Sequence, residues 1–519
     1  MLDKGIKEQL KTIFAGLRSE ICFSMQSRSD DVRSAEMLEF LQDVASASPK
    51  LSVSTKDGDT EAPEFEIIKD GSATGVKFCG IPNGHEFTTL LLAVLNADGQ
   101  GKNLPDSTLT ARIKALKGPL SLRTFVSLTC TNCPDVAQAL NVVALLNPQV
   151  TNTVTDGAVV PGLVEKFDIK SVPAVYAGDR LVSVGRSTLG DLLAKLEETG
   201  GSAAAADDTA PVVRDFDVTV LGAGPAGCAA AIYCVRKGFS TAVVAGAVGG
   251  QVLETMDIGN LISVPSVTGP QLGANLREHL AAYPVELFEN RTVNGASVTG
   301  TEKELRCTGE IFRSRALIIA TGAGWRHLSV PGEAEHIGHG VAFCTHCDGP
   351  YYAGKRVAVV GGGNSGVEAA IDMAALCPHV DVFEFTDSLK ADSVLQQKMA
   401  SLPNVDVHLS KQVTEIIGDG RSVSGIRVRD IASGKEEVYP VSGVFVQIGQ
   451  KPNSTLFQGQ LPLNKGAEIE VDRTCRTTVK GVYAAGDVTD VPYKQVVIAM
   501  GEGGKAALSA FLDFMRGEI

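Results

Sequence analysis

The sequence has no excess of basic residues, no long apolar run and no export signal. Its 60 acidic side chains outnumber the 47 basic ones and give a net charge of −13. This argues against nucleic acid as the main partner, because phosphate binding requires excess positive charge. The longest apolar candidate, 216–235, is interrupted by Asp217 and Pro225, whereas a membrane-spanning helix needs about 18 apolar residues. Residues 1–8 carry early acids and no apolar core, unlike a signal peptide. We therefore expect a cytoplasmic protein that binds neither membranes nor nucleic acid.

The 11 cysteines include only two close pairs, Cys130 with Cys133 and Cys344 with Cys347. Without an export signal the compartment is reducing, and a close pair there is more often catalytic than structural. A zinc site is the alternative, but over 200 residues separate the two pairs, against roughly 15–20 in common zinc ribbons. We therefore expect two redox dithiols and no metal.

The first dithiol follows a buried strand at 122–128 and precedes a helical pattern at 135–146. Strand, Cys-x-x-Cys and helix is the thioredoxin arrangement. A cysteine at a helix N-terminus is stabilised as the nucleophilic thiolate by the positive end of the helix dipole. About forty residues further on, Pro173 enters another strand, and we expect its peptide bond to be cis and to lie against the dithiol; a trans proline opening an edge strand is the alternative.

The segment before the linker is too long for one thioredoxin-like unit, which needs about 100 residues. We therefore expect two tandem units, a degenerate copy at 1–102 and a unit with the dithiol at 103–197. The linker at 198–213 is rich in Ala and Asp and lacks large apolar side chains.

A second pattern repeats within the chain after the linker. An apolar strand at 218–221 leads into a G-x-G-x-x-G turn at 222–227, and a strand at 357–360 leads into another at 361–366. Each turn runs into a helix of small residues. The glycines permit the tight turn, the close approach of a pyrophosphate and close helix packing, so two dinucleotide sites are expected.

The residues that follow distinguish the two sites. Glu384 lies at the end of the next strand, 23 residues after Gly361, where an acid can bind the adenosine ribose hydroxyls. No Arg follows it to hold a 2′-phosphate, which favours NADH over NADPH. The matching strand of the first site, 241–246, ends without an acid. Near the C-terminus, Asp487 ends another strand, where it is expected to hold the ribityl or phosphate end of a flavin.

The second dithiol lies between the two glycine-rich turns, which favours electron exchange with a bound cofactor. From 216 to the end, the chain is similar to low-molecular-weight thioredoxin reductases. With the thioredoxin-like front end, it resembles the flavoprotein subunits of bacterial alkyl hydroperoxide reductases. The specific marks are the motifs at 130–136, 249–251, 344–350, 361–368 and 484–487.

The resemblance implies an α/β fold in which two tandem thioredoxin-like units precede a Rossmann-like flavoprotein that binds two dinucleotides, FAD and NADH. An FAD-binding domain at 214–332 and 452–519 is then interrupted by an NADH-binding domain at 333–451. It also implies a homodimer that reduces a peroxiredoxin. The residues expected to contact the cofactors are Gly222, Ala223, Gly224, Pro225, Ala226, Gly227, Gly250, Gln251, Asn260, Thr321, Gly322, Gly486, Asp487, Gln495, Val496, Gly361, Gly362, Gly363, Asn364, Ser365, Gly366, Glu368 and Glu384.

The implied mechanism is a relay from NADH to FAD, to Cys344–Cys347, to Cys130–Cys133 and then to the peroxiredoxin. Asp348 is the expected general acid, with a turn-capping role as the alternative. Glu86 is expected to carry protons for Cys130 and Cys133, which requires the two thioredoxin-like units to pack face to face. A capping or surface role is the alternative. A rotation of the NADH-binding domain is expected about crossings near 331–338 and 449–453.

Two other functions remain open from the sequence. A thioredoxin reductase fused to its own thioredoxin would prefer NADPH. A redox-sensing module that binds flavin and nucleotide without turnover is an alternative of another class.

Overall fold

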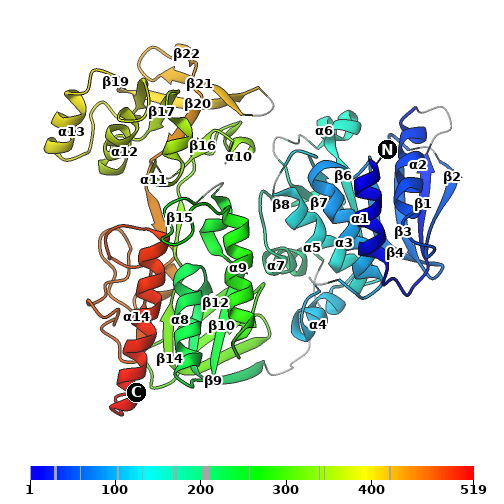
Figure 1. Cartoon of the computed structure of the whole chain (residues 1–519), viewed down its shortest axis with the longest axis horizontal. Coiled ribbons are helices and arrows are strands. Elements are labelled where there is room, and N and C mark those ends of the chain that lie inside the picture. The colour runs from blue at the N-terminus through cyan, green and yellow to red at the C-terminus, as the bar shows by residue number, and fades with distance from the viewer. Residues whose placement is uncertain are drawn as a thin grey trace. The chain divides into compact units, whose positions relative to one another are not determined.

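The computed structural model describes residues 2–27, 32–58, 60–101, 104–130, 132–167, 169, 172–200, 211–255, 258–337, 339–343, 345–419 and 422–519, without the side chains of Glu254, His346 and Cys347. The chain divides into two compact units, Met1–Ala210 and Pro211–Ile519 (Figure 1). Among the described helices, none combines the length and apolarity needed to cross a membrane.

The first unit is built on one mixed eight-stranded sheet, in the order β2-β1-β3-β4-β6-β5-β7-β8. Its strands are β1 (Ile21–Ser27), β2 (Leu51–Asp57), β3 (Glu64–Lys69), β4 (Ser72–Cys79), β5 (Leu120–Val126), β6 (Val150–Asp156), β7 (Ala174–Ala177) and β8 (Arg180–Val184). Its helices are α1 (Lys4–Phe14), α2 (Val32–Ala45), η1 (Gly84–Glu86), α3 (Phe87–Ala97), α4 (Ser107–Ala115), α5 (Cys133–Leu146), η2 (Gly157–Val159), α6 (Pro161–Lys166) and α7 (Leu189–Gly200).

The two predicted thioredoxin-like units share this sheet, because β4 and β6 pair in parallel with Val76 opposite Asn152. They also share a core, in which Phe23 and Phe65 belong to the same buried cluster as Cys133. The halves are therefore joined edge to edge. The face-to-face packing that the sequence analysis required for Glu86 is wrong, because backbone hydrogen bonds across the β4–β6 edge join the halves.

Local sequence accounts for several of the helix starts. Asp3 and Asp106 are the N-caps of α1 and α4, and each accepts a hydrogen bond from a backbone N–H of the first turn. α5 begins with Cys133 followed by a proline, a position where the missing N–H costs nothing. The dithiol thus lies where a strand ends and a well-specified helix begins.

The second unit contains a seven-stranded sheet with the order β11-β10-β9-β14-β13-β12, and β25 pairs with β14. Its strands are β9 (Val212–Ala223), β10 (Thr241–Val248), β11 (Glu286–Phe288), β12 (Val293–Ser297), β13 (Lys303–Cys307), β14 (Glu310–Ile319) and β25 (Val482–Ala484). The accompanying helices are α8 (Pro225–Arg236), η3 (Gly250–Glu254), α9 (Gly269–Ala281), η5 (Thr455–Phe457) and α14 (Val496–Met515). α14 packs along α8, which brings the C-terminal segment to the first glycine-rich turn (Figure 1).

A second sheet interrupts the first in sequence and has five parallel strands in the order β16-β23-β17-β18-β19. Its strands are β16 (Val341–Ala342), β17 (Arg356–Val360), β18 (His379–Phe383), β19 (Val405–His408) and β23 (Gly443–Val446), flanked by the antiparallel β20 (Lys411–Gly418), β21 (Val423–Asp430) and β22 (Glu436–Tyr439). The helices here are α10 (Glu333–His336), α11 (Thr345–Asp348), η4 (Gly349–Tyr352), α12 (Asn364–Ala374) and α13 (Ser393–Ala400).

Segment boundaries differ from the sequence expectations in two places. α7 continues to Gly200 and β9 begins at Val212, so the ends of the expected linker belong to regular elements. Two short strands, β15 (Ala323–Trp325) and β24 (Gln450–Pro452), pair where the chain enters and leaves the second sheet. This strand pair precedes the crossing expected at 331–338 and overlaps the one expected at 449–453.

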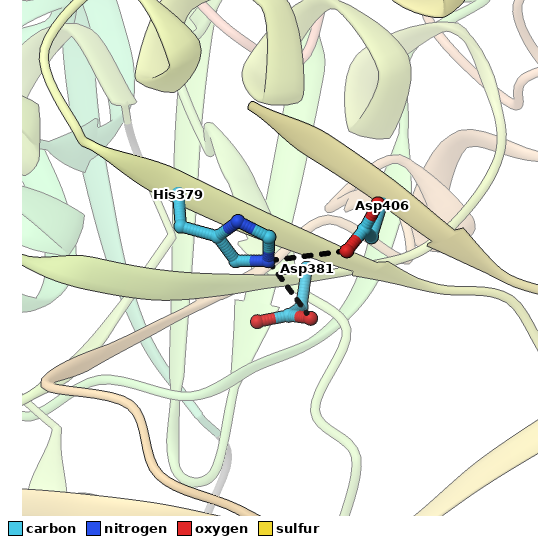
Figure 2. Close-up of side chains that lie close together, drawn as sticks. All are labelled: His379, Asp381 and Asp406. Carbon is cyan, nitrogen blue, oxygen red and sulfur yellow. Dashed lines mark ion pairs between the residues drawn. The ribbon is translucent and has the colours of Figure 1, made fainter. Parts of the chain in front are cut away.

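A buried carboxylate ties three strands of the second sheet together. Asp381 accepts hydrogen bonds from Arg356 at 2.8 and 3.1 Å, and its contact with the His408 ring nitrogen is 3.0 Å. Burial would raise the pKa of Asp381, but these bonds outweigh it and hold the pKa at about 2. His379 Nε2 lies 3.4 Å from both Asp381 and Asp406 (Figure 2). Because Arg356 already occupies both Asp381 oxygens, we describe this group as an ion-pair network.

Candidate active site

The first dithiol is present as a Cys130–Cys133 disulfide with 5.5 Å between the two Cα atoms. Cys133 is fully buried at the start of α5, whereas Cys130 is partly exposed in the preceding turn. The Cys133 N–H donates to Cys130 Sγ at 3.1 Å, a bond that would stabilise a thiolate on Cys130. Cys130 is therefore the sulfur of this pair that another protein can reach.

The predicted cis proline lies against this disulfide. The Val172–Pro173 peptide bond is cis, as the sequence analysis predicted. The Val172 carbonyl oxygen lies 3.9 Å from Cys130 Sγ. The backbone carbonyl of the cis peptide bond therefore lies beside the reachable sulfur of the pair.

Glu86 reaches the dithiol region from the degenerate half. η1, which ends with Glu86, packs against α5, and the His85 N–H donates to the Leu128 carbonyl at 3.1 Å, two residues before Cys130. The Glu86 carboxyl is fully buried, and neither oxygen has a hydrogen-bond partner among the described residues. Burial raises the pKa of Glu86 to about 7. A carboxyl in this state can take up and release a proton near neutral pH.

Replacing Glu86 with Gln is expected to stabilise the protein at neutral and alkaline pH, and far less in acid. The folded pKa of about 7 exceeds the ordinary value, so the stability due to this group is full below about pH 4 and is lost as the pH rises through 7. Ionising the buried group costs about 3 kcal/mol, so Glu86→Gln should raise the unfolding free energy by roughly that amount at pH 9 and by less than about 1 kcal/mol at pH 5.

Calorimetric unfolding of the full chain at both pH values would measure this difference. Glu20→Gln is the matched control, because the Glu20 side chain is 67% exposed in the same unit. An equal gain for both variants at pH 9 would contradict the assignment to the buried carboxyl.

The second unit contains a cavity of about 770 Å³, within the range of ligand sites. The first glycine-rich turn, the η3 turn and the segment before α14 line it together. The expected FAD-contacting residues found on its wall are Gly222, Ala223, Gly224, Pro225, Ala226, Gly250, Gln251, Thr321, Gly322, Gly486, Asp487, Gln495 and Val496. Gly227 and Asn260 are not on the wall; Asn260 instead donates to the Gln495 side chain at 3.1 Å.

The glycine-rich turn of this cavity fits a dinucleotide. Gly222 has a φ of +107°, and a Cβ there would overlap the Ala320 carbonyl oxygen. Gly224 is the N-cap of α8 and Pro225 follows it, so the helix N-terminus opens toward the cavity. Free N–H groups and the helix dipole at this position favour a pyrophosphate.

The other wall comes from the C-terminal segment. Gly486 N–H donates to the buried Glu502 carboxylate at 3.0 Å, which fixes the turn that carries Asp487. Burial raises the pKa of Asp487, as expected for an acid facing an enclosed site. Gln495 is the N-cap of α14 and Val496 its first residue, so a second helix N-terminus meets the same cavity.

Sequence reasoning missed several residues that line the cavity. Trp325, the only tryptophan in the chain, donates its indole N–H to the Gln251 amide and stacks on Phe343 with 5.7 Å between ring centroids. Lys494 precedes the expected Gln495 and forms an ion pair with Glu468 at 2.9 Å. Because Lys494 is adjacent to the predicted Gln495, its place on the cavity wall could have been predicted. Nothing local in the sequence indicates that Trp325 lies there.

The second dithiol segment reaches this cavity as well. Thr345 and Asp348, at the two ends of α11, line the same wall, and Thr345 Oγ1 donates to Asp372 at 3.4 Å. Cys344 and the Cys347 side chain lie outside the described residues. Of the expected NADH contacts, only Ser365 and Glu368 are on this wall.

The second glycine-rich turn has the same construction as the first. A Cβ at Gly361, where φ is +125°, would overlap the Gln447 carbonyl oxygen, and α12 begins directly after Gly363. The Glu384 carboxylate lies against this turn and accepts the Gly362 N–H at 2.5 Å. The expected acid and the expected turn are therefore in contact. The Asn364 side-chain amide donates to the Asp392 carboxylate at 3.1 Å.

Fold and site together define a disulfide oxidoreductase that uses FAD and a nicotinamide dinucleotide. Residues 216–503 match the pyridine nucleotide-disulphide oxidoreductase family, and residues 123–198 match the thioredoxin domain family. The chain belongs to the family of alkyl hydroperoxide reductase F subunits. It is 45% identical over 521 residues to the F subunit from Pseudomonas aeruginosa and 43% identical over 522 residues to the one from Escherichia coli, each alignment covering 99% of both chains.

Solved structures agree for the second part of the chain. The thioredoxin reductase of Streptococcus pyogenes is 31% identical, with a TM-score of 0.56, and the match covers 58% of this chain and 99% of that one. The thioredoxin reductase of Giardia duodenalis gives a TM-score of 0.55 at the same identity and coverage. The sequence expectation of a thioredoxin-like part followed by a thioredoxin-reductase-like flavoprotein is thus confirmed.

Proposed function

We propose that this chain is an NADH-dependent reductase of a peroxiredoxin, the second component of an alkyl hydroperoxide reductase. The observation that carries this proposal is that one chain contains two cysteine pairs, each in a setting suited to disulfide exchange. Asp348 and Thr345, beside the second cysteine pair, line the cavity of the first glycine-rich turn, and Cys130 presents a reachable sulfur in the other unit. The relatives are named as F subunits of alkyl hydroperoxide reductases, which supports a peroxide-reducing partner.

The cofactors are assigned to the two glycine-rich turns. FAD is held by the cavity of the second unit, with its pyrophosphate at the N-terminus of α8 and Asp487 toward the ribityl or phosphate end. NADH is held by the turn at 361–366, with its adenosine ribose at Glu384. The chemistry that bound FAD would supply is to accept a hydride from NADH and to pass the electron pair to a disulfide.

The cysteines then carry the electron pair by thiol–disulfide exchange. Reduction breaks the Cys344–Cys347 bond and leaves two thiols, with Cys347 nearer to FAD. The Cys344 thiolate attacks Cys130, which breaks the Cys130–Cys133 bond, and Cys347 resolves the mixed disulfide. Cys130 next attacks the disulfide of the oxidised peroxiredoxin, and Cys133 resolves that second mixed disulfide.

Two carboxyl groups are proposed to move the protons. Asp348, on the cavity wall, protonates the thiolate that leaves when the second pair is reduced. Glu86 serves the first pair, because burial places its pKa at about 7, between the ordinary values of a carboxyl and a thiol. In this proposal, each dithiol therefore has one carboxyl as its proton carrier.

The same proposal includes an assembly and a motion. The chain acts as a cytoplasmic homodimer, and the NADH-binding segment rotates about the β15–β24 crossing so that its thiols meet FAD and Cys130 in turn. Crossing segments at element ends are where hinge motions are absorbed. Sedimentation of the purified protein tests the homodimer.

The test of the function is peroxide-dependent oxidation of the nicotinamide cofactor. The assay uses hydrogen peroxide and a peroxiredoxin of the kind found as the C component of alkyl hydroperoxide reductases. Loss of reduced-nicotinamide absorbance should require the peroxiredoxin and be at least about tenfold faster with NADH than with NADPH. Equal rates with both nucleotides, or preference for NADPH, would favour a fused thioredoxin reductase. Absence of turnover would favour a non-catalytic redox sensor.

A further inference from the structure

The Glu384 carboxylate is held on both of its oxygens before any nucleotide arrives. Oε2 accepts the Gly362 N–H at 2.5 Å. Oε1 accepts the backbone N–H of Thr386 at 2.8 Å and its hydroxyl at 2.7 Å. One residue, Thr386, therefore supplies two of the three hydrogen bonds that fix the acid at the end of β18.

The segment after Glu384 is itself fixed to the glycine-rich turn. The backbone N–H groups of Lys390 and Ala391 donate to the Gly362 carbonyl at 2.8 and 3.2 Å. The Thr386 carbonyl accepts from the Ser410 N–H at 2.9 Å, which ties the segment to the end of β19. Thr386 is thus presented to Glu384 by a closed loop, and its side chain needs little further ordering when a ligand binds.

The Thr386 hydroxyl has a second acceptor within reach. Its oxygen lies 2.8 Å from the Ser388 carbonyl and 2.7 Å from Glu384. A hydroxyl has one proton, so it can donate to only one of these groups at a time. The carboxylate is the stronger acceptor of the two because it is charged, so the hydroxyl proton is assigned to Glu384.

The acceptor positions of Glu384 are mostly filled by the protein itself. An ionised carboxylate has about four lone-pair positions, and three are taken in the structure. The remaining position is available to a ribose hydroxyl, and the three protein hydrogen bonds fix its direction.

We propose that Thr386 is a positioning residue for the adenosine ribose and a determinant of the choice between NADH and NADPH. This rests on the proposed assignment of the nucleotide to Glu384. Thr386 holds the carboxylate in one orientation before and after the ribose binds, so that Glu384 does not have to be ordered when the nucleotide arrives. The NADP 2′-phosphate gains nothing from this arrangement, because it brings no donor and faces a fixed negative charge.

Two substitutions at Thr386 test the proposal. Thr386→Val keeps the shape and the backbone N–H but removes the hydroxyl, and Thr386→Ser keeps the hydroxyl. Calorimetric titration of the oxidised holoprotein should use NAD⁺ and NADP⁺, which cannot deliver hydride to the flavin. Thr386→Val should weaken NAD⁺ binding about tenfold and leave NADP⁺ binding unchanged, and Thr386→Ser should restore most of the loss.

Steady-state kinetics provide a second readout. The KM for NADH in dye reduction should rise with Thr386→Val while kcat stays the same, because the hydroxyl acts on nucleotide binding. Equal weakening of NAD⁺ and NADP⁺, without rescue by Thr386→Ser, would show a general folding role and overturn the proposal. Unchanged NAD⁺ affinity in Thr386→Val would also overturn it.

Glu384→Ala separates this inference from the function on which it rests. If Glu384→Ala weakens NAD⁺ binding and Thr386→Val does not, the nucleotide site stands and only the role of Thr386 fails. If Glu384→Ala leaves NAD⁺ binding unchanged, the assignment of the ribose to Glu384 fails, and the inference fails with it.

Discussion

Replacement of both Cys130 and Cys133 with serine is expected to abolish peroxiredoxin reduction while NADH-driven reduction of a dye continues at the normal rate. A serine hydroxyl cannot undergo thiol–disulfide exchange, so the relay would end at the second cysteine pair. The loss should be at least about 10³-fold, the scale seen when a covalent nucleophile is removed. The dye assay should be unaffected, because the variant changes only the first unit.

The two activities should be measured on the same preparation, with flavin content as a check on folding. Cys22→Ser is the matched control, since Cys22 is a half-exposed free cysteine of the same unit that lies 3.4 Å from Ser54 Oγ. It should keep both activities. Normal peroxiredoxin reduction by the Cys130→Ser/Cys133→Ser variant would show that the second pair reaches the partner directly, and the relay would be wrong.

The sequence could predict those parts of the site whose chemistry requires one particular local backbone geometry. A G-x-G-x-x-G turn between a strand and a helix needs its glycines wherever it occurs, and Gly222 and Gly361 both have the positive φ that the turn requires. The acid at the end of the following strand is similar, because the pairing of β17 with β18 brings Glu384 to Gly362. Both features were predicted from spacing alone.

The parts that sequence could not predict depend on contacts between distant segments. Nothing in the strand patterns gives the β4–β6 pairing, which merges two units into one sheet and carries Glu86 to the dithiol turn without face-to-face packing. Trp325 reaches the cavity only because β15 pairs with β24. The contact of the Thr386 hydroxyl with Glu384 depends on how the loop after β18 closes, and nothing in the strand pattern gives it.

Alanine at the third glycine of each turn is expected to separate the two cofactor sites. A Cβ at Gly227 would overlap the Gly222 carbonyl oxygen, and a Cβ at Gly366 would overlap the Gly361 carbonyl oxygen. Both obstacles are backbone, so the helix would have to move away from the turn that receives the pyrophosphate. Gly227→Ala should therefore lower the flavin content of the purified protein at least about tenfold, with loss of every activity.

Gly366→Ala should leave the protein yellow and remove its response to NADH. Dithionite would still reduce the flavin of this variant, which would show that only nucleotide binding is lost. Gly501→Ala is the control, because Gly501 is exposed within α14, has no atom within 4 Å of an added Cβ, and should keep its flavin and gain about 1 kcal/mol of helix stability. Loss of flavin from Gly366→Ala, or a normal NADH response, would contradict the assignment of one cofactor to each turn. The two turns share one backbone construction, so a difference between their variants can only come from the ligand that each turn holds.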